Sequence, residues 1–146
     1  MGVNIIIGFI IPWIVALAIV RERKIIYYIA PFAIILATII NASGLYYFWA
    51  IYPFELGNLS IVPLNTGLFC LFPCVSFQII KKYDINAYTG LPVASLIMTL
   101  IEGSGVLAGR IVYYNHWNII LTYFSYLIPL LVCYGLYKFL KKRNLI

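Results

Sequence analysis

The sequence has 146 residues, of which 64% are hydrophobic and 10% charged, and its mean hydropathy is +1.02. In soluble domains about a quarter of all residues are charged, so this composition excludes an ordinary water-soluble domain. It predicts an all-α, polytopic membrane protein whose single transmembrane domain takes up residues 1–146. The net charge of +6 would suggest nucleic acid as a partner of a soluble protein. Here we expect the lipid bilayer as partner and no nucleic acid.

Five apolar runs follow one another along the chain, each near the roughly 18–20 residues that a helix needs to cross a bilayer. The first run ends at the basic segment Arg21–Lys24. A secretory signal peptide carries its charge before its apolar core, so we expect an uncleaved first helix, kinked at Pro12. The predicted spans are residues 3–20, 25–43, 59–80, 88–108 and 118–140.

The basic residues lie almost entirely on one side of the predicted membrane. Of the ten lysines and arginines, only Arg110 falls on the other side. The other nine are Arg21, Arg23, Lys24, Lys81, Lys82, Lys138, Lys141, Lys142 and Arg143. Cytoplasmic loops are enriched in Lys and Arg, so the pattern predicts an outside N-terminus and a cytoplasmic C-terminus.

The loop between the fourth and fifth spans is rich in aromatic residues. It carries Arg110, Tyr113, Tyr114, His116 and Trp117. Tyr and Trp gather where the membrane meets water, so we expect this group to lie at the outer interface.

A carboxylate, Glu102, lies within the fourth predicted span. At 100° per residue, Ser95, Thr99, Glu102, Gly105 and Gly109 occupy about a third of the helix circumference. The last two form a G-x-x-x-G pattern, which allows another helix to approach closely. The sequence therefore predicts that Glu102 lies on a face that packs against protein.

Polar residues on other spans are candidates to meet this face. Asn118, Thr122 and Ser125 share one face of the fifth span, and Asn65 lies on the third. Because the fourth and fifth spans are antiparallel and joined by a short loop, we expect their polar faces to form a seam around Glu102.

Two interpretations of Glu102 remain open. A carboxylate at mid-bilayer costs about 2.5 kcal/mol or more, so such residues usually face a cavity or a packed interior. In the first interpretation, Glu102 binds a proton, a cation or a small polar ligand. In the second, Glu102 is neutral or hydrogen-bonded and only joins helices. The protein is then a structural or accessory subunit that packs on other membrane proteins, or on itself, through its fourth span. Arg110 lies about 12 Å farther along the helix, too far for direct pairing.

An enzymatic function is the least favoured. No second carboxylate lies in any predicted span, so classical ligands cannot assemble a metal cluster or a two-carboxylate site. His116 is the only histidine and has no obvious orienting acid. We expect no catalytic residue, metal or cofactor.

The segments "FIIPWI", "APF", "PLNTGLF" and "TLIEGSGVLAGRIVYYNHWNI" resemble an uncharacterised family of small multi-pass membrane proteins, found chiefly in Gram-positive spore-forming bacteria. The resemblance is sharpest over the final 50 or so residues. It points to an acidic residue in the penultimate span, then a glycine, a tyrosine and a Trp-Asn pair. Those positions are Glu102, Gly109, Tyr113 or Tyr114, and Trp117 with Asn118. The resemblance implies a bacterial cytoplasmic membrane and no particular reaction.

Overall fold

The computed structural model describes all 146 residues and contains five helical runs that are long and apolar enough to cross a membrane. The first run consists of α1 (Gly2–Ile5), the π-helical η1 (Ile6–Ile10) and α2 (Ile11–Ile19), and the second is α3 (Arg23–Gly44). The third consists of the 3-10 segment η2 (Phe54–Ser60), α4 (Val62–Leu64), the π-helical η3 (Asn65–Phe69) and α5 (Cys70–Lys82). The last two are α6 (Ala87–Leu107) and α7 (Ile119–Lys142). The predicted spans agree within two residues at every end except the start of the third, which begins at Phe54.

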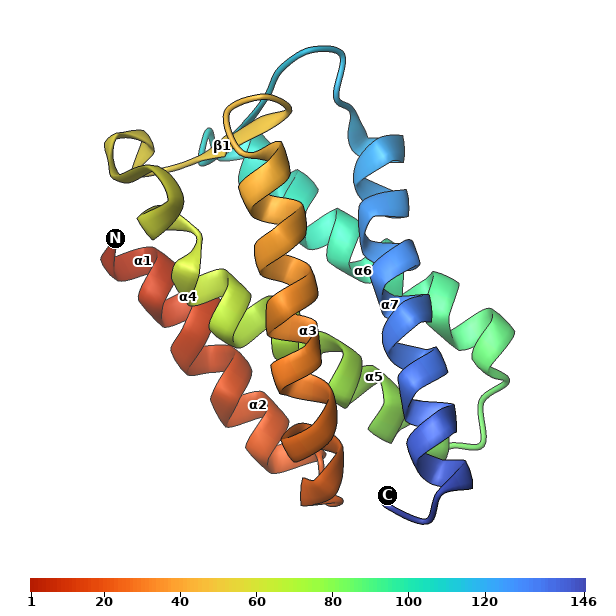
Figure 1. Ribbon diagram of the computed structural model, residues 1–146. Coiled ribbons are helices and arrows are strands. Elements are labelled where there is room, and N and C mark those ends of the chain that lie inside the picture. The colour runs from red at the N-terminus through yellow and green to blue at the C-terminus, as the bar shows by residue number, and fades with distance from the viewer.

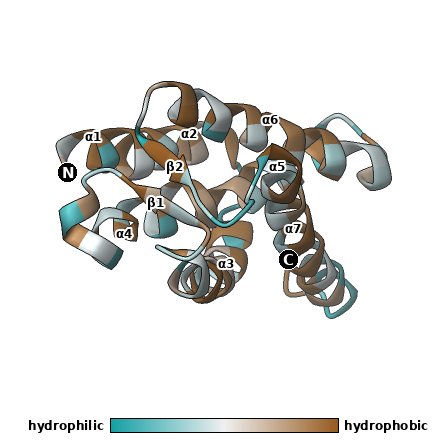
Figure 2. Cartoon of the chain, turned by 90° about the horizontal axis from the view of Figure 1, so that it is seen from above, coloured by the Kyte–Doolittle hydropathy of each residue, from teal (hydrophilic) through white to brown (hydrophobic).

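The five runs form one bundle (Figure 1). Helix α3 packs on α5 and α7, α2 packs on α5, and α6 packs mainly on α7. Many outward-facing side chains are large and apolar, including Leu107, which is 92% exposed. The brown of hydrophobic residues predominates along the helices (Figure 2). An apolar surface of this extent marks a protein that meets lipid or another protein rather than water.

The first and third runs touch through backbone at two glycines. A Cβ at Gly67 would lie 2.1 Å from the carbonyl oxygen of Gly8 and 2.5 Å from Cα of Phe9. Both glycines lie in π-helical segments, η1 and η3. The missing side chain at Gly67 therefore sets how closely these runs approach.

One end of the bundle, which we call the sheet end, carries a two-stranded antiparallel sheet. Strand β1 (Trp49–Ile51) pairs with β2 (Ile111–Tyr113), with Trp49 opposite Tyr113. Strand β2 lies in the segment that the sequence predicted as the loop between the fourth and fifth spans. The Trp49 ring lies against Gly44, where an added Cβ would be 2.1 Å from it. Asn4 ties the first helix to this end, since its Nδ2 donates to the carbonyl oxygens of Tyr52 and Ser60, both at 2.8 Å.

The opposite end, which we call the basic end, carries nine of the ten basic residues. A salt bridge of 2.6 Å joins Lys81 Nζ to Glu22 Oε2. Gln78 Oε1 accepts a hydrogen bond from the backbone N–H of Glu22 at 3.3 Å. These contacts fasten the α2–α3 turn to the end of α5.

Candidate functional site: a carboxylate at the sheet end

Glu102 lies in the last turns of α6, close to where the chain reverses. Gly109 adopts φ +68°, a conformation that favours glycine. The N–H of Arg110 donates to Gly105 O at 2.9 Å, and the N–H of Gly109 donates to Val106 O at 3.0 Å. This is the hydrogen-bond pattern of a Schellman motif. The reversal leads into β2 and returns Tyr113 to the side of Glu102.

The same motif corrects the expectation for the G-x-x-x-G pattern. A Cβ at Gly105 would meet the Ile111 side chain of β2 at 3.0 Å, and one at Gly109 would meet nothing within 4 Å. Neither glycine brings α6 against another helix within the chain. Within the chain, the two glycines belong to the Schellman motif that ends α6.

Three hydroxyl groups surround the Glu102 carboxylate. Tyr113 Oη donates to Oε1 at 2.6 Å, and Tyr126 Oη donates to Oε2. Thr122 Oγ1 lies 3.4 Å from Oε1. The carboxylate thus joins α6 to β2 through Tyr113 and to α7 through Tyr126, with the Thr122 hydroxyl beside it.

The hydrogen bonds that lead to Glu102 form a relay in which each group donates to the next. Trp117 Nε1, which can only donate, lies 2.9 Å from Thr122 Oγ1. Thr122 Oγ1 in turn donates to Tyr113 Oη at 2.9 Å, so the proton of Tyr113 is free to point at Glu102. The relay ends on Glu102 Oε1, and Tyr126 Oη donates to Oε2, so both carboxylate oxygens accept. The arrangement suits an ionised Glu102, whose oxygens only accept.

Tyr113 is held in its neutral, donating form. Burial raises its pKa, and the charge of Glu102 and the hydrogen bond to it raise the pKa further. The Tyr113 hydroxyl therefore keeps its proton throughout the neutral pH range.

Glu102 has no cationic side chain beside it. The only salt bridge in the structure is the one between Lys81 and Glu22 at the basic end. The Arg110 guanidinium lies over the Tyr52 ring, 5.5 Å from its centre. The side-chain hydrogen bonds that the Glu102 carboxyl group accepts come from hydroxyl groups alone.

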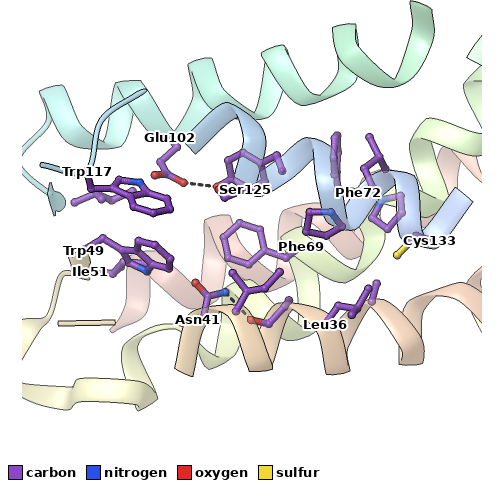
Figure 3. A pocket seen from close by; sticks show the side chains of 18 residues that line it. Leu36, Asn41, Trp49, Ile51, Phe69, Phe72, Glu102, Trp117, Ser125 and Cys133 are labelled. Carbon is purple, nitrogen blue, oxygen red and sulfur yellow. Dashed lines mark hydrogen bonds between the residues drawn. The ribbon is translucent and has the colours of Figure 1, made fainter. Parts of the chain in front are cut away.

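Glu102 lines a pocket of about 80 Å³ among α3, η3, α5, α6 and α7, and its lining also includes Trp49, Ile51 and Ile111 of the sheet. Figure 3 shows Glu102 and Asn41 on opposite walls, with Trp49 and Trp117 together at one end of the pocket. The lining is mostly apolar; its polar members include Asn41, Glu102 and Ser125. A volume of this size holds about five water molecules or a ligand of a few heavy atoms.

Asn41 is oriented by Asn65. Nδ2 of Asn41 donates to Asn65 Oδ1 at 2.8 Å and to Ala37 O at 2.9 Å. Asn65 thus lies behind the pocket wall, apart from Glu102, and its part in the site is to fix Asn41. Both amide protons of Asn41 are used, which leaves its Oδ1 as an acceptor.

The structure places the other predicted polar residues around the site in different roles. Thr99 Oγ1 donates to Ser95 O at 2.8 Å, and Ser95 Oγ is buried without a partner; neither bonds to Glu102. Asn118 caps α7, because its Oδ1 accepts from the N–H groups of Ile120 and Leu121. Ser125 Oγ donates to Thr122 O at 2.8 Å and lines the pocket.

The five residues assigned to the outer interface divide into two groups. Tyr113 and Trp117 turn inward and belong to the relay that ends at Glu102. Arg110 lies on the Tyr52 ring, while Tyr114 and His116 are exposed near the tip of the loop. His116 has no contact with the carboxylate network.

Sequence reasoning missed several residues of the pocket. Tyr126 lies four residues after Thr122 on the same face of α7, so helical periodicity could have found it. Trp49 and Phe69 reach the pocket from segments far from Glu102 in the sequence, and no spacing pattern identifies them. No three His, Cys, Asp or Glu residues lie close enough together to hold a metal ion.

Comparison of the chain with protein-family models, with curated proteins and with solved structures finds no match.

Proposed function

We propose that this chain is a multi-pass membrane protein that binds a small cation at Glu102. One observation carries the proposal: a carboxylate lines a pocket, and no side chain of the chain supplies the opposite charge. An unpaired charge away from water is costly, and a bound cation offsets that cost. The directed hydroxyl relay supports the ionised form of Glu102 that a cation would meet.

A structural role is the second candidate, favoured by the same hydrogen bonds. The carboxylate joins α6, β2 and α7, so it fastens the sheet end whether or not a ligand binds. The exposed apolar face of α6 offers a surface to partner proteins under this alternative. The two candidates differ in whether a cation changes the stability of the protein through Glu102.

Cation binding is tested by thermal unfolding in a nonionic detergent. A ligand that binds only the folded state adds about 2.7 kcal/mol of stability at 100 times its Kd. We expect at least one of the chloride salts of sodium, potassium, methylammonium and ethylammonium to raise the Tm of the wild type. Glu102→Gln in the same salts should show a smaller rise in Tm, because it lacks the carboxylate that holds the cation. Screening by the salts affects both proteins equally.

The control for this experiment is Glu22→Gln, which removes an exposed carboxylate that pairs with Lys81. This variant should keep the response to the salts. Equal shifts in the wild type and Glu102→Gln, for every salt, would contradict the proposed function and leave the structural role.

We also propose that the sheet end faces outward and the basic end faces the cytoplasm of a bacterial cell. The distribution of nine basic residues against Arg110 supports this orientation. A reporter that fluoresces only in the cytoplasm should be active when fused after Ile146 and inactive when fused before Met1. The reverse result would contradict the orientation.

A further inference from the structure

We infer that the cation held at Glu102 is a small primary alkylammonium ion, either free or at the end of a lipid headgroup. The inference rests on the proposed function and names the class of ligand. It depends on three features of the pocket: its aromatic rings, its free acceptors and its size.

Five aromatic side chains, which we call the aromatic wall, line the pocket: Trp49, Phe69, Phe72, Trp117 and Tyr126. The rings of Trp49 and Trp117 lie 4.8 Å apart between centres, and those of Phe69 and Tyr126 lie 5.9 Å apart. The faces of such rings attract cations, and most strongly cations that have lost their water. The aromatic wall therefore favours an organic cation whose alkyl part can replace water against the rings.

The polar atoms of the pocket are suited to accept hydrogen bonds from an ammonium group. Glu102 lies on one wall, and Asn41 Oδ1 lies on the other with both Asn41 amide protons already donated (Figure 3). Ser125 Oγ donates its proton to Thr122 O and keeps its lone pairs. A primary ammonium brings three N–H donors and no acceptor, which complements these oxygens.

Size and composition disfavour metal ions. Hard cations such as Ca²⁺ and Mg²⁺ take six or more oxygen ligands, and the pocket walls supply few beyond Glu102, Asn41 and Ser125. A volume of about 80 Å³ accommodates an ammonium with one to three carbons. An alkylammonium ion donates its N–H groups to the few oxygens, and its carbon atoms pack on the apolar rest of the wall.

Tryptophan fluorescence tests this inference directly. Two of the three tryptophans belong to the aromatic wall, and the third, Trp13, donates to Thr66 O elsewhere. In a Trp13→Phe background, in nanodiscs of phosphatidylglycerol, ethylammonium chloride should change the emission saturably. Sodium and potassium chloride at equal concentration should not, and tetramethylammonium, which lacks N–H groups, should bind at least several-fold more weakly.

A pair of phenylalanine variants separates the aromatic wall from general effects. Phe69→Leu keeps an apolar side chain but removes a ring, and should weaken ethylammonium binding by about tenfold. Phe124→Leu, at an exposed position of α7 outside the pocket, should bind like its parent. Equal affinity in the two variants would overturn the role of the aromatic wall.

The source of the ammonium is decided by adding phosphatidylethanolamine to the nanodiscs. If its headgroup fills the site, free ethylammonium should bind several-fold more weakly; an unchanged affinity identifies a free amine. Both outcomes support an alkylammonium ligand. Binding of sodium or potassium alone, abolished by Glu102→Gln, would overturn the inference and leave the proposed function standing. Tetramethylammonium binding as tight as that of ethylammonium would overturn the assignment to a primary amine.

Discussion

Replacing Gly67 with alanine is expected to destabilise the folded chain by about 3 kcal/mol, at the upper end of the range for overpacking. The added Cβ would lie 2.1 Å from Gly8 O and 2.5 Å from Phe9 Cα. Both are backbone atoms, so no side-chain rotation relieves the overlap. The first helical run would have to move away from the third, which would also disturb the bonds from Asn4 to the sheet end.

The control is Gly135→Ala in α7, where an added Cβ meets nothing within 4 Å. Alanine there should stabilise the helix by about 0.5–1 kcal/mol. Thermal and detergent-induced unfolding, followed by circular dichroism, measure both changes. If Gly67→Ala is as stable as Gly135→Ala, the backbone contact between η1 and η3 is not what holds these runs together.

Replacing Glu102 with leucine is expected to cost about 2 kcal/mol of stability or more. The substitution leaves Tyr113 and Tyr126 without their acceptor, and an unsatisfied buried hydroxyl costs about 1–3 kcal/mol. Glu102→Gln should cost less, because its amide oxygen can accept from Tyr113 while its NH₂ group donates to Tyr126. The order wild type, Glu102→Gln, Glu102→Leu is the expected order of decreasing Tm in detergent without added amine.

The phenylalanine variants of the two tyrosines check the origin of this effect. Tyr126→Phe and Tyr113→Phe each remove one bond to the carboxylate, and each should lower stability by about 1.5–3 kcal/mol. In the Glu102→Leu background the same changes should cost little, since the acceptor is already gone. If each tyrosine substitution lowers stability as much in Glu102→Leu as in the wild type, the tyrosines act by packing and not through Glu102.

The helices could be predicted from the sequence because each is an apolar run bounded by charges or turn residues. Glu102 could be selected because a carboxylate is rare in such a run. The polar face shared by Thr122 and Ser125 also predicted contact between α6 and α7, and Thr122 meets Glu102 as expected from antiparallel packing.

Other features depend on contacts that local sequence does not encode. The pairing of Trp49 with Tyr113 joins segments more than 60 residues apart. The glycines of G-x-x-x-G fit both helix packing and a Schellman motif, and the positive φ of Gly109 and the hydrogen bonds around it identify the Schellman motif. The close approach at Gly8 and Gly67 carries no recognised motif, so it was not predicted.

The contacts of two aromatic residues in the loop between α6 and α7 also could not be predicted from local sequence. Tyr113 and Trp117 have the composition and position of membrane-interface anchors, which is why the sequence predicted that role. Their inward orientation follows from the reversal at Gly109 and from the pairing of β2 with β1. Tertiary structure thus makes Tyr113 a donor to the Glu102 carboxylate and Trp117 a donor to Thr122.

Infrared difference spectroscopy of the carboxyl group is the most direct test that Glu102 is an ionised cation ligand. Spectra of the wild type and Glu102→Gln, each with and without ethylammonium chloride at neutral pH, isolate the signal of this side chain. We expect a carboxylate band that is absent from Glu102→Gln and that shifts when ethylammonium is added. A protonated carboxyl band that ethylammonium leaves unchanged would contradict cation binding at Glu102.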